Sequence, residues 1–249
     1  DLGGGSDEKI VCVFLLIGLA MPLWGWAQDA AKEPAAAAQA ELDRLHEEAK
    51  QACYAADYQT ALQKWQVGLE QARALNDKRY ISQFLTGIGV VYWSLGQYQE
   101  ALTYSKQALV IAREIGDRRR EGVDLGNLGL VYENLGQYQE ALKYYEQALV
   151  IAREIGDRRD EGNALGNFGN VYRKLGQYQE ALNYYEQTLD IHRKIGDRYW
   201  EGADLTNLGV VYGSLGQYQE ALKYYEQALV IHREISDRRG EGVDLTNLG

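Results

Sequence analysis

The sequence predicts an all-α protein in which similar helical hairpins stack side by side as a solenoid. The first observation is a repeat with a period of 40 residues: the string LGQYQEAL begins at Leu95, Leu135, Leu175 and Leu215. Periods of this length are typical of solenoids and other repeat architectures. The second is the composition, which is 46% hydrophobic with only two prolines among 249 residues and therefore suits a folded, largely helical chain.

Each repeat contains two helices, as the unit 117–156 illustrates. Asp117 is a natural N-cap, because its side chain can accept hydrogen bonds from free backbone N–H groups of the first turn. Apolar residues follow at helical spacing until Gly136, which can adopt the positive φ that ends a helix. The second helix is predicted from about Tyr138 to Ile155. One such hairpin cannot bury its apolar face alone, so neighbouring hairpins must bury it for each other.

Small residues explain how the helices pack closely. Gly129 on the first helix and Ala141 on the second are expected to let the two backbones approach, and Ala148 is expected to do the same against the following repeat. Val123 is counted among the apolar residues that follow at helical spacing along the first helix.

The repeat resembles the tetratricopeptide repeat, since its residues stand at the spacing of that family's eight-position signature: Leu125, Leu128, Gly129, Tyr132, Tyr138, Ala141, Tyr145 and Ala148. Two departures are Leu125, where the family prefers tryptophan, and Arg153, where it usually has proline. The long period, with its recurring GDRxxEG, resembles the Pins/LGN family of peptide-binding adaptors and repeat arrays common in bacterial, particularly cyanobacterial, proteins. The resemblance implies a right-handed α-solenoid whose first helices line a concave groove.

The repeat array is expected to cover residues 41–249. Its first unit is degenerate, as terminal repeats often are. The sixth unit stops after its first signature residues, so we interpret the chain as a fragment whose last unit is truncated. The predicted units are about 41–76, 77–116, 117–156, 157–196, 197–236 and 237–249.

Residues 1–27 are predicted to be a signal peptide or an N-terminal anchor. An apolar run is followed by a proline and by small residues at Gly25 and Ala27, an arrangement typical of a cleaved secretory signal. The alternative is an uncleaved membrane anchor, because residues 10–27 are at the short limit for spanning a bilayer. Residues 28–40 are expected to be a linker. The protein is therefore expected to be exported, periplasmic or secreted, if the signal is cleaved, and membrane-anchored otherwise.

A column of asparagines is the first candidate for ligand binding. A carboxamide can both donate to and accept from a peptide backbone, and in the Pins/LGN-like adaptors such asparagines contact the ligand backbone. The alternative is that they hydrogen-bond between adjacent helices or persist from duplication. The column consists of Asn127, Asn167, Asn207 and Asn247.

Groove positions that vary between repeats are the candidates for specificity. The fourth unit offers a polar, basic patch and the second an aromatic side chain, so a ligand with an acidic group near one end and an apolar residue near the other would suit the groove. The alternative is that these are ordinary solvated helix positions. The residues are Trp93, Glu133, Asn134, Asn170, Arg173 and Lys174.

Other classes of function are disfavoured. The net charge of −10 argues against a nucleic acid as partner. The three histidines, His46, His192 and His232, lack the further ligands and the spacing of a metal site. We identify no nucleophile with its base, no phosphate-binding loop and no paired catalytic carboxylates. No metal, cofactor or catalytic residue is therefore predicted, and the chain is expected not to be an enzyme.

The sequence thus predicts a protein–protein interaction scaffold that binds an extended peptide or a partner helix in its concave groove. Two alternatives remain. The array could be the sensing arm of a larger enzyme, such as one with a CHAT protease-like domain encoded beyond residue 249. It could also be a self-assembling array, because the uncapped C-terminal end would expose Leu245 and Leu248 to another copy. The sequence does not identify the protein or peptide partner.

Overall fold

The computed structural model describes residues 36–249, and every regular element among them is an α-helix. The predicted signal or anchor (1–27) and most of the linker lie outside the described residues, whereas residues 36–40 are already helical. After a first helix at 36–54, the elements are α2 (Tyr58–Ala74), α3 (Lys78–Ser94), α4 (Tyr98–Glu114), α5 (Arg118–Asn134), α6 (Tyr138–Ile155), α7 (Arg158–Lys174), α8 (Tyr178–Ile195), α9 (Arg198–Ser214), α10 (Tyr218–Glu234) and α11 (Arg238–Leu248).

Caps and turns divide the chain into hairpins at the predicted places. The Asp117 carboxylate accepts from the backbone N–H of Arg120 at the start of α5. Gly136 has φ of 73° between α5 and α6, the left-handed conformation that glycine adopts without a steric penalty. Ser236 follows α10 where earlier repeats have Gly156 and Gly196, and it too has a positive φ, of 60°. The prediction of α6 is confirmed at both ends, because the helix runs from Tyr138 to Ile155.

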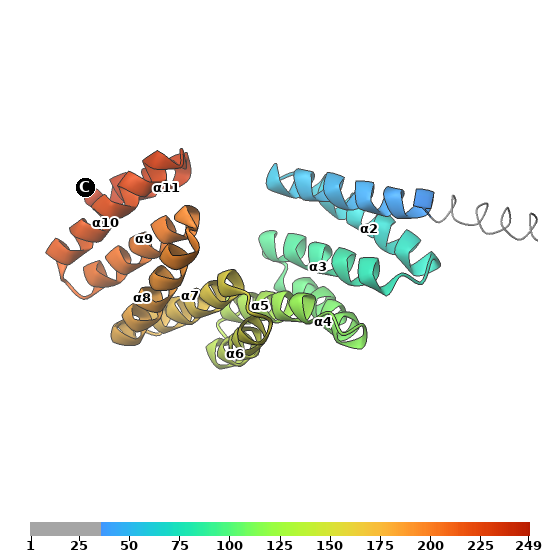
Figure 1. Ribbon diagram of the computed structural model, residues 1–249, viewed down its shortest axis with the longest axis horizontal. Helices are drawn as coiled ribbons and strands as arrows, with labels where there is room; N and C mark the ends of the chain where they lie inside the picture. The colour runs from blue at the N-terminus through green and yellow to red at the C-terminus, as the bar shows by residue number, and fades with distance from the viewer. Residues whose placement is uncertain (1–35) are drawn as a thin grey trace, which may run out of the picture.

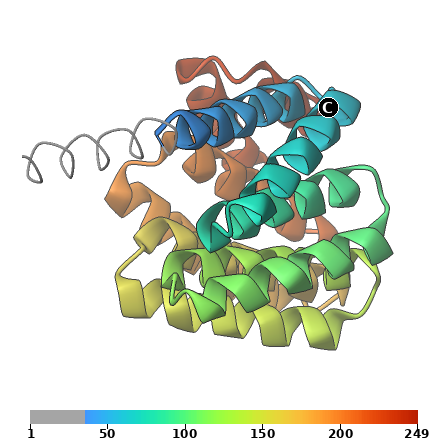
Figure 2. The same cartoon turned by 90° about the vertical axis from the view of Figure 1, so that its right-hand side faces the viewer.

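The hairpins form an arch with two layers of helices (Figure 1). We call α3, α5, α7, α9 and α11 the inner helices and α4, α6, α8 and α10 the outer helices. Inner helices pack directly on inner helices of the next hairpin, at α3–α5, α5–α7 and α9–α11. Each outer helix packs mainly on its own partner and on the following inner helix. The closer spacing of the inner layer makes that face concave. Both ends of the stack therefore lie on the same side of the molecule (Figure 2).

Tyrosine rings fill the space within each hairpin, and this corrects part of the packing prediction. A Cβ built on Gly129 would lie 2.5 Å from Cδ1 of Tyr145 and 2.9 Å from Cζ of the same ring. Gly129 therefore makes room for a buried aromatic ring and not for the backbone of α6. In the same hairpin, the rings of Tyr132 and Tyr144 stack with 5.2 Å between their centroids. Val123, one of the apolar residues at helical spacing, is 42% exposed.

Candidate peptide-binding groove

The concave face contains a cavity of about 300 Å³ between α5, α7 and α9. Its walls come from three consecutive inner helices, with contributions from α6 and α8 between them. Four of the predicted site residues line it: Asn127, Asn167, Asn170 and Asn207.

The asparagine column occupies the middle of this cavity. Asn127, Asn167 and Asn207 occupy the same position of α5, α7 and α9 and are all partly buried. Among the described residues, no side-chain hydrogen bond ties these three carboxamides to a neighbour. By contrast, Asn170 accepts from the hydroxyl of Tyr185 at 2.7 Å. The three carboxamides can therefore hydrogen-bond a molecule that enters the cavity. The fourth member, Asn247 on α11, is exposed and lies outside the cavity.

Glycines give the cavity its depth. A Cβ built on Gly126 of α5 would meet nothing within 4 Å, and one on Gly166 of α7 would make only ordinary contact with Thr188, 3.7 Å from its Cγ2. Neighbouring inner helices have threonines at this position, Thr86 on α3 and Thr206 on α9. The cavity is therefore open where two consecutive repeats have glycine in place of a larger side chain.

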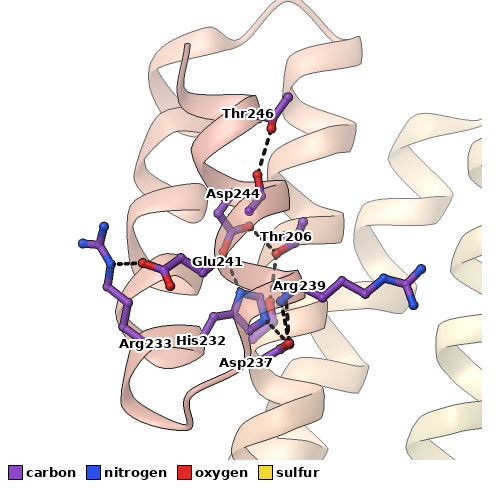
Figure 3. A network of polar contacts seen from close by, with 11 residues as sticks. Thr206, His232, Arg233, Asp237, Arg239, Glu241, Asp244 and Thr246 are labelled. Carbon is purple, nitrogen blue, oxygen red and sulfur yellow. Dashed lines mark hydrogen bonds and ion pairs between the residues drawn. The ribbon is translucent and has the colours of Figure 1, made fainter. Parts of the chain in front are cut away.

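Buried aspartates lie between the inner helices on either side of these glycines. Thr86 donates from Oγ1 to Oδ1 of Asp124 at 2.7 Å, and Thr206 donates to Asp244 at the same distance. Asp244 also accepts from Nδ1 of His232 at 2.7 Å, and Figure 3 shows its carboxylate between the threonine and the histidine. Burial away from water raises the pKa of Asp124 to about 7, because it disfavours the charged form. The two threonine contacts tie α3 to α5 and α9 to α11.

A third buried aspartate, Asp204, lies in the wall of the cavity itself. Oδ2 of Asp204 on α9 is 2.7 Å from Nδ1 of His192 on α8, and both side chains are buried. Burial raises the pKa of Asp204 to about 6, although the histidine partly offsets this effect. Nε2 of His192 is buried without a hydrogen-bond partner among the described residues. The cavity wall thus contains polar atoms as well as apolar side chains.

The predicted basic patch is partly neutralised within the chain. Nζ of Lys174 lies 2.9 Å from Oε1 of Glu133, a buried carboxylate that also accepts from the hydroxyl of Tyr145 at 2.7 Å. Arg173, the residue before Lys174, is half-buried. An acidic ligand group would therefore compete with Glu133 for Lys174.

The other two variable positions differ from each other. Trp93 on α3 is partly buried and lines a smaller cavity of about 100 Å³, which shares Asn127 and Leu130 with the main one. Asn134 is exposed, and its amide donates to the Leu130 carbonyl of its own helix at 2.8 Å. Trp93 thus adjoins the groove, whereas Asn134 lies at the end of α5, outside both cavities.

Comparison with known families agrees with this architecture. A model of the tetratricopeptide repeat matches residues 80–154, 123–194 and 160–234, which together cover more than half of the chain. The chain belongs to the tetratricopeptide repeat (TPR) family. A search of curated proteins finds no match.

Solved structures show that the TPR array shares its fold with several proteins. Aspartyl phosphate phosphatase F from Bacillus subtilis superposes with a TM-score of 0.76 at 15% identity, covering 84% of this chain and 55% of that one. A Rap conjugation gene regulator of the plasmid pLS20, in complex with the Phr* peptide, gives 0.70 at 18% identity over 79% and 55%. A putative kinesin light chain of P. anserina with nearly identical TPR-like repeats gives 0.63 at 24% identity over 79% and 96%. The TPR array therefore spans about half the length of the first two proteins.

The structure also places at the groove residues that the sequence analysis did not select. Trp200 lines the cavity, is 39% exposed and stacks on His192 with 6.1 Å between ring centroids. Tyr199 packs edge-on against it at 5.4 Å. A signal was available, because the units that follow the second have Arg120, Asp160 and Gly240 at the position of Trp200, and the second has Tyr80. Comparing repeats at every position of the first helices would have found it.

Within residues 36–249 no group of three or more His, Cys, Asp or Glu side chains is arranged to hold a metal ion. Over the same residues no helix is both long enough and apolar enough to cross a bilayer.

Proposed function

We propose that this TPR array is a non-enzymatic scaffold that binds an extended peptide in the groove formed by α5, α7 and α9. The observation that carries the proposal is the cavity of about 300 Å³ with three carboxamides along it, one from each inner helix. The array as a whole is a protein-interaction fold, and the groove is the part of its surface best formed to receive a chain.

The spacing of the carboxamides favours an extended peptide over a partner helix. Adjacent packed helices lie roughly 8–10 Å apart, and an extended chain advances about 3.3 Å per residue. Asn127, Asn167 and Asn207 would therefore meet the peptide backbone about once every three residues. A carboxamide can satisfy both the N–H and the C=O of a residue in an extended chain. The backbone of a helix, by contrast, is already hydrogen-bonded internally.

The structural neighbours support a peptide partner. The Rap regulator of pLS20 was solved in complex with the Phr* peptide, and its fold resembles that of this chain over 79% of the residues here. At 18% identity this likeness concerns the fold, so the peptide itself is not carried over. It supports the choice of a peptide as the class of ligand.

A selection with a displayed library of random peptides tests the proposal. Peptides selected on the purified protein should bind the double variant Asn127→Ala with Asn167→Ala much more weakly. Counting at least one hydrogen bond of about 1 kcal/mol net for each asparagine, the double change should cost at least roughly 2 kcal/mol, or about 30-fold in Kd by isothermal titration calorimetry.

Two exposed carboxamides on outer helices provide the matched control. Gln147 on α6 and Asn183 on α8 lie away from the cavity, so the double change Gln147→Ala with Asn183→Ala should leave Kd unchanged. Equal affinity of the selected peptides for the wild type and the groove variant would reject the groove as the binding site.

We further propose that the protein is exported, on the basis of the apolar run in residues 10–27 and the small residues that follow it. Expression of the gene with its leader, followed by fractionation and N-terminal sequencing, separates the two possible outcomes. A soluble product beginning at Gln28 supports cleavage. A membrane-bound product that retains the apolar run supports an anchor, and an intact cytosolic product would contradict export.

A further inference from the structure

Asp204, a buried aspartate in the groove, lacks a hydrogen bond that Asp124 and Asp244 accept at the same position of other repeats. At this position of the inner helices, Asp124 and Asp244 each accept through Oδ1 from a threonine of the preceding repeat, at 2.7 Å in both cases. The two residues of each pair are 38 positions apart in sequence. The same offset links Gly166 to Asp204. Asp204 therefore occupies the acceptor position of this contact, while the preceding repeat has no side chain that could donate.

The surroundings of Asp204 show that this place belongs to the groove. Asp204 is 3% exposed, and its Oδ2 lies beside His192 Nδ1. Among the described residues we find no donor to its Oδ1. Gly166, His192 and Asp204 all line the main cavity. Nε2 of the 1% exposed His192 also lacks a partner among the described residues and faces Gly162, whose Cβ would lie 2.6 Å from it.

The size of the space indicates what would fill it. A Cβ on Gly166 would only touch Thr188, 3.7 Å from Cγ2 and 3.9 Å from Oγ1. A Cβ above Gly166 therefore displaces nothing, and the cavity that Gly166 lines leaves space beyond it for a small side chain. At the two equivalent carboxylates of this chain, Asp124 and Asp244, a threonine hydroxyl is the donor. Because the Asp204 side chain is largely buried and its Oδ1 has no donor among the described residues, a ligand that supplies a donor is favoured over one that does not.

We propose that the bound peptide places a serine or threonine side chain above Gly166 and donates its hydroxyl to Oδ1 of Asp204. The ligand thereby completes, from outside, the contact that Thr86 and Thr206 make within the chain. This inference rests on the proposed function and specifies one side chain of the peptide.

The geometric premise can be tested without a ligand. Gly166→Thr in the full chain should form the missing bond to Asp204 and raise Tm. Gly126→Thr is the matched control, because its Cβ is equally unobstructed but the residue 38 positions later is Ala164, which cannot accept. Gly166→Thr should raise Tm by several degrees more than Gly126→Thr, and the difference should vanish when Asp204 is replaced by alanine. Equal shifts for the two threonine variants would overturn the inference.

The ligand is tested with peptides selected from the random library on the full chain. In those peptides, one Ser or Thr changed to Ala should weaken binding to the wild type about tenfold. The same change should have no effect with the variant His192→Ala, Asp204→Ala. That variant reproduces the pair Ala152 and Ala164 that the chain already has one repeat earlier, so it is expected to fold. Gly166→Thr should weaken binding at least tenfold, because its side chain occupies the space.

The outcomes distinguish this inference from the proposed function. Peptides that depend on Asn127 and Asn167 but show the same Ser-to-Ala loss with the wild type and the His192→Ala, Asp204→Ala variant would refute the hydroxyl contact alone. So would peptides that couple to Asp204 through Lys or Arg. Peptides that bind independently of both asparagines would instead refute the groove proposal.

Discussion

Two glycines one helical turn apart on α5 should respond to alanine in opposite directions. At Gly129 the new Cβ would lie 2.5 Å from Cδ1 and 2.9 Å from Cζ of Tyr145. That ring is fully buried and its hydroxyl donates to Glu133 at 2.7 Å, so it cannot move aside without losing this bond. Overpacking costs typically 1–3 kcal/mol, and loss of the hydrogen bond adds about 1 kcal/mol. Helix propensity returns about 1 kcal/mol, so Gly129→Ala should destabilise by roughly 1–3 kcal/mol.

At Gly126 the only expected effect of alanine is its higher helix propensity. Its Cβ would meet nothing within 4 Å, so Gly126→Ala should stabilise by up to about 1 kcal/mol. Urea denaturation followed by circular dichroism measures both changes on the same helix. A repeat array can unfold in more than one step, so the midpoint of the first transition should be compared as well. If Gly129→Ala is as stable as Gly126→Ala, the tyrosine packing described here is wrong.

Two further predictions concern charges in the inner layer. Lys174→Ala removes the cation beside buried Glu133 and should destabilise the protein by about 1–3 kcal/mol. As a control, Lys194→Ala removes an exposed ion pair with Asp190 and should cost under about 0.5 kcal/mol. Equal losses of stability in urea denaturation would contradict the pairing of Lys174 with Glu133. Asp124 has a pKa of about 7 in the folded protein against 3.8 for an ordinary Asp. The free-energy cost of holding its charged form in the folded protein is therefore absent below pH 4, grows as pH rises and is complete above pH 7. Asp124→Asn should therefore be more stable than the wild type at pH 8, by at most roughly 4 kcal/mol, and equally stable near pH 4; a difference independent of pH would refute this.

The sequence was sufficient for the fold because the repeat supplies the same information several times. Asp caps, the turn glycines and the helical spacing of apolar residues predicted the bounds of α6 at both ends. Packing within the hairpin was less accessible. A glycine such as Gly129 indicates that something approaches closely, but sequence spacing alone did not identify the ring of Tyr145 as the neighbour.

The candidate site was predictable only where it depends on position within the repeat. Three of the four column asparagines line the cavity because the inner helices superpose from unit to unit. The pairing of Glu133 with Lys174 was not predicted, since it depends on how far α7 is displaced along α5. Gly166 and Asp204 could have been related in advance, because Thr86 and Asp124 stand at the same offset in another unit. Only the structure shows that residues at this offset are joined by a hydrogen bond.

The groove can be tested most directly by titrating a selected peptide into the wild type and into the Asn127→Ala, Asn167→Ala variant, with the Gln147→Ala, Asn183→Ala protein as control. Isothermal titration calorimetry gives Kd for each. Binding through α5 and α7 predicts a Kd about 30-fold higher for the groove variant and unchanged for the control. The same Kd for all three proteins would contradict the proposal that the concave groove receives the peptide.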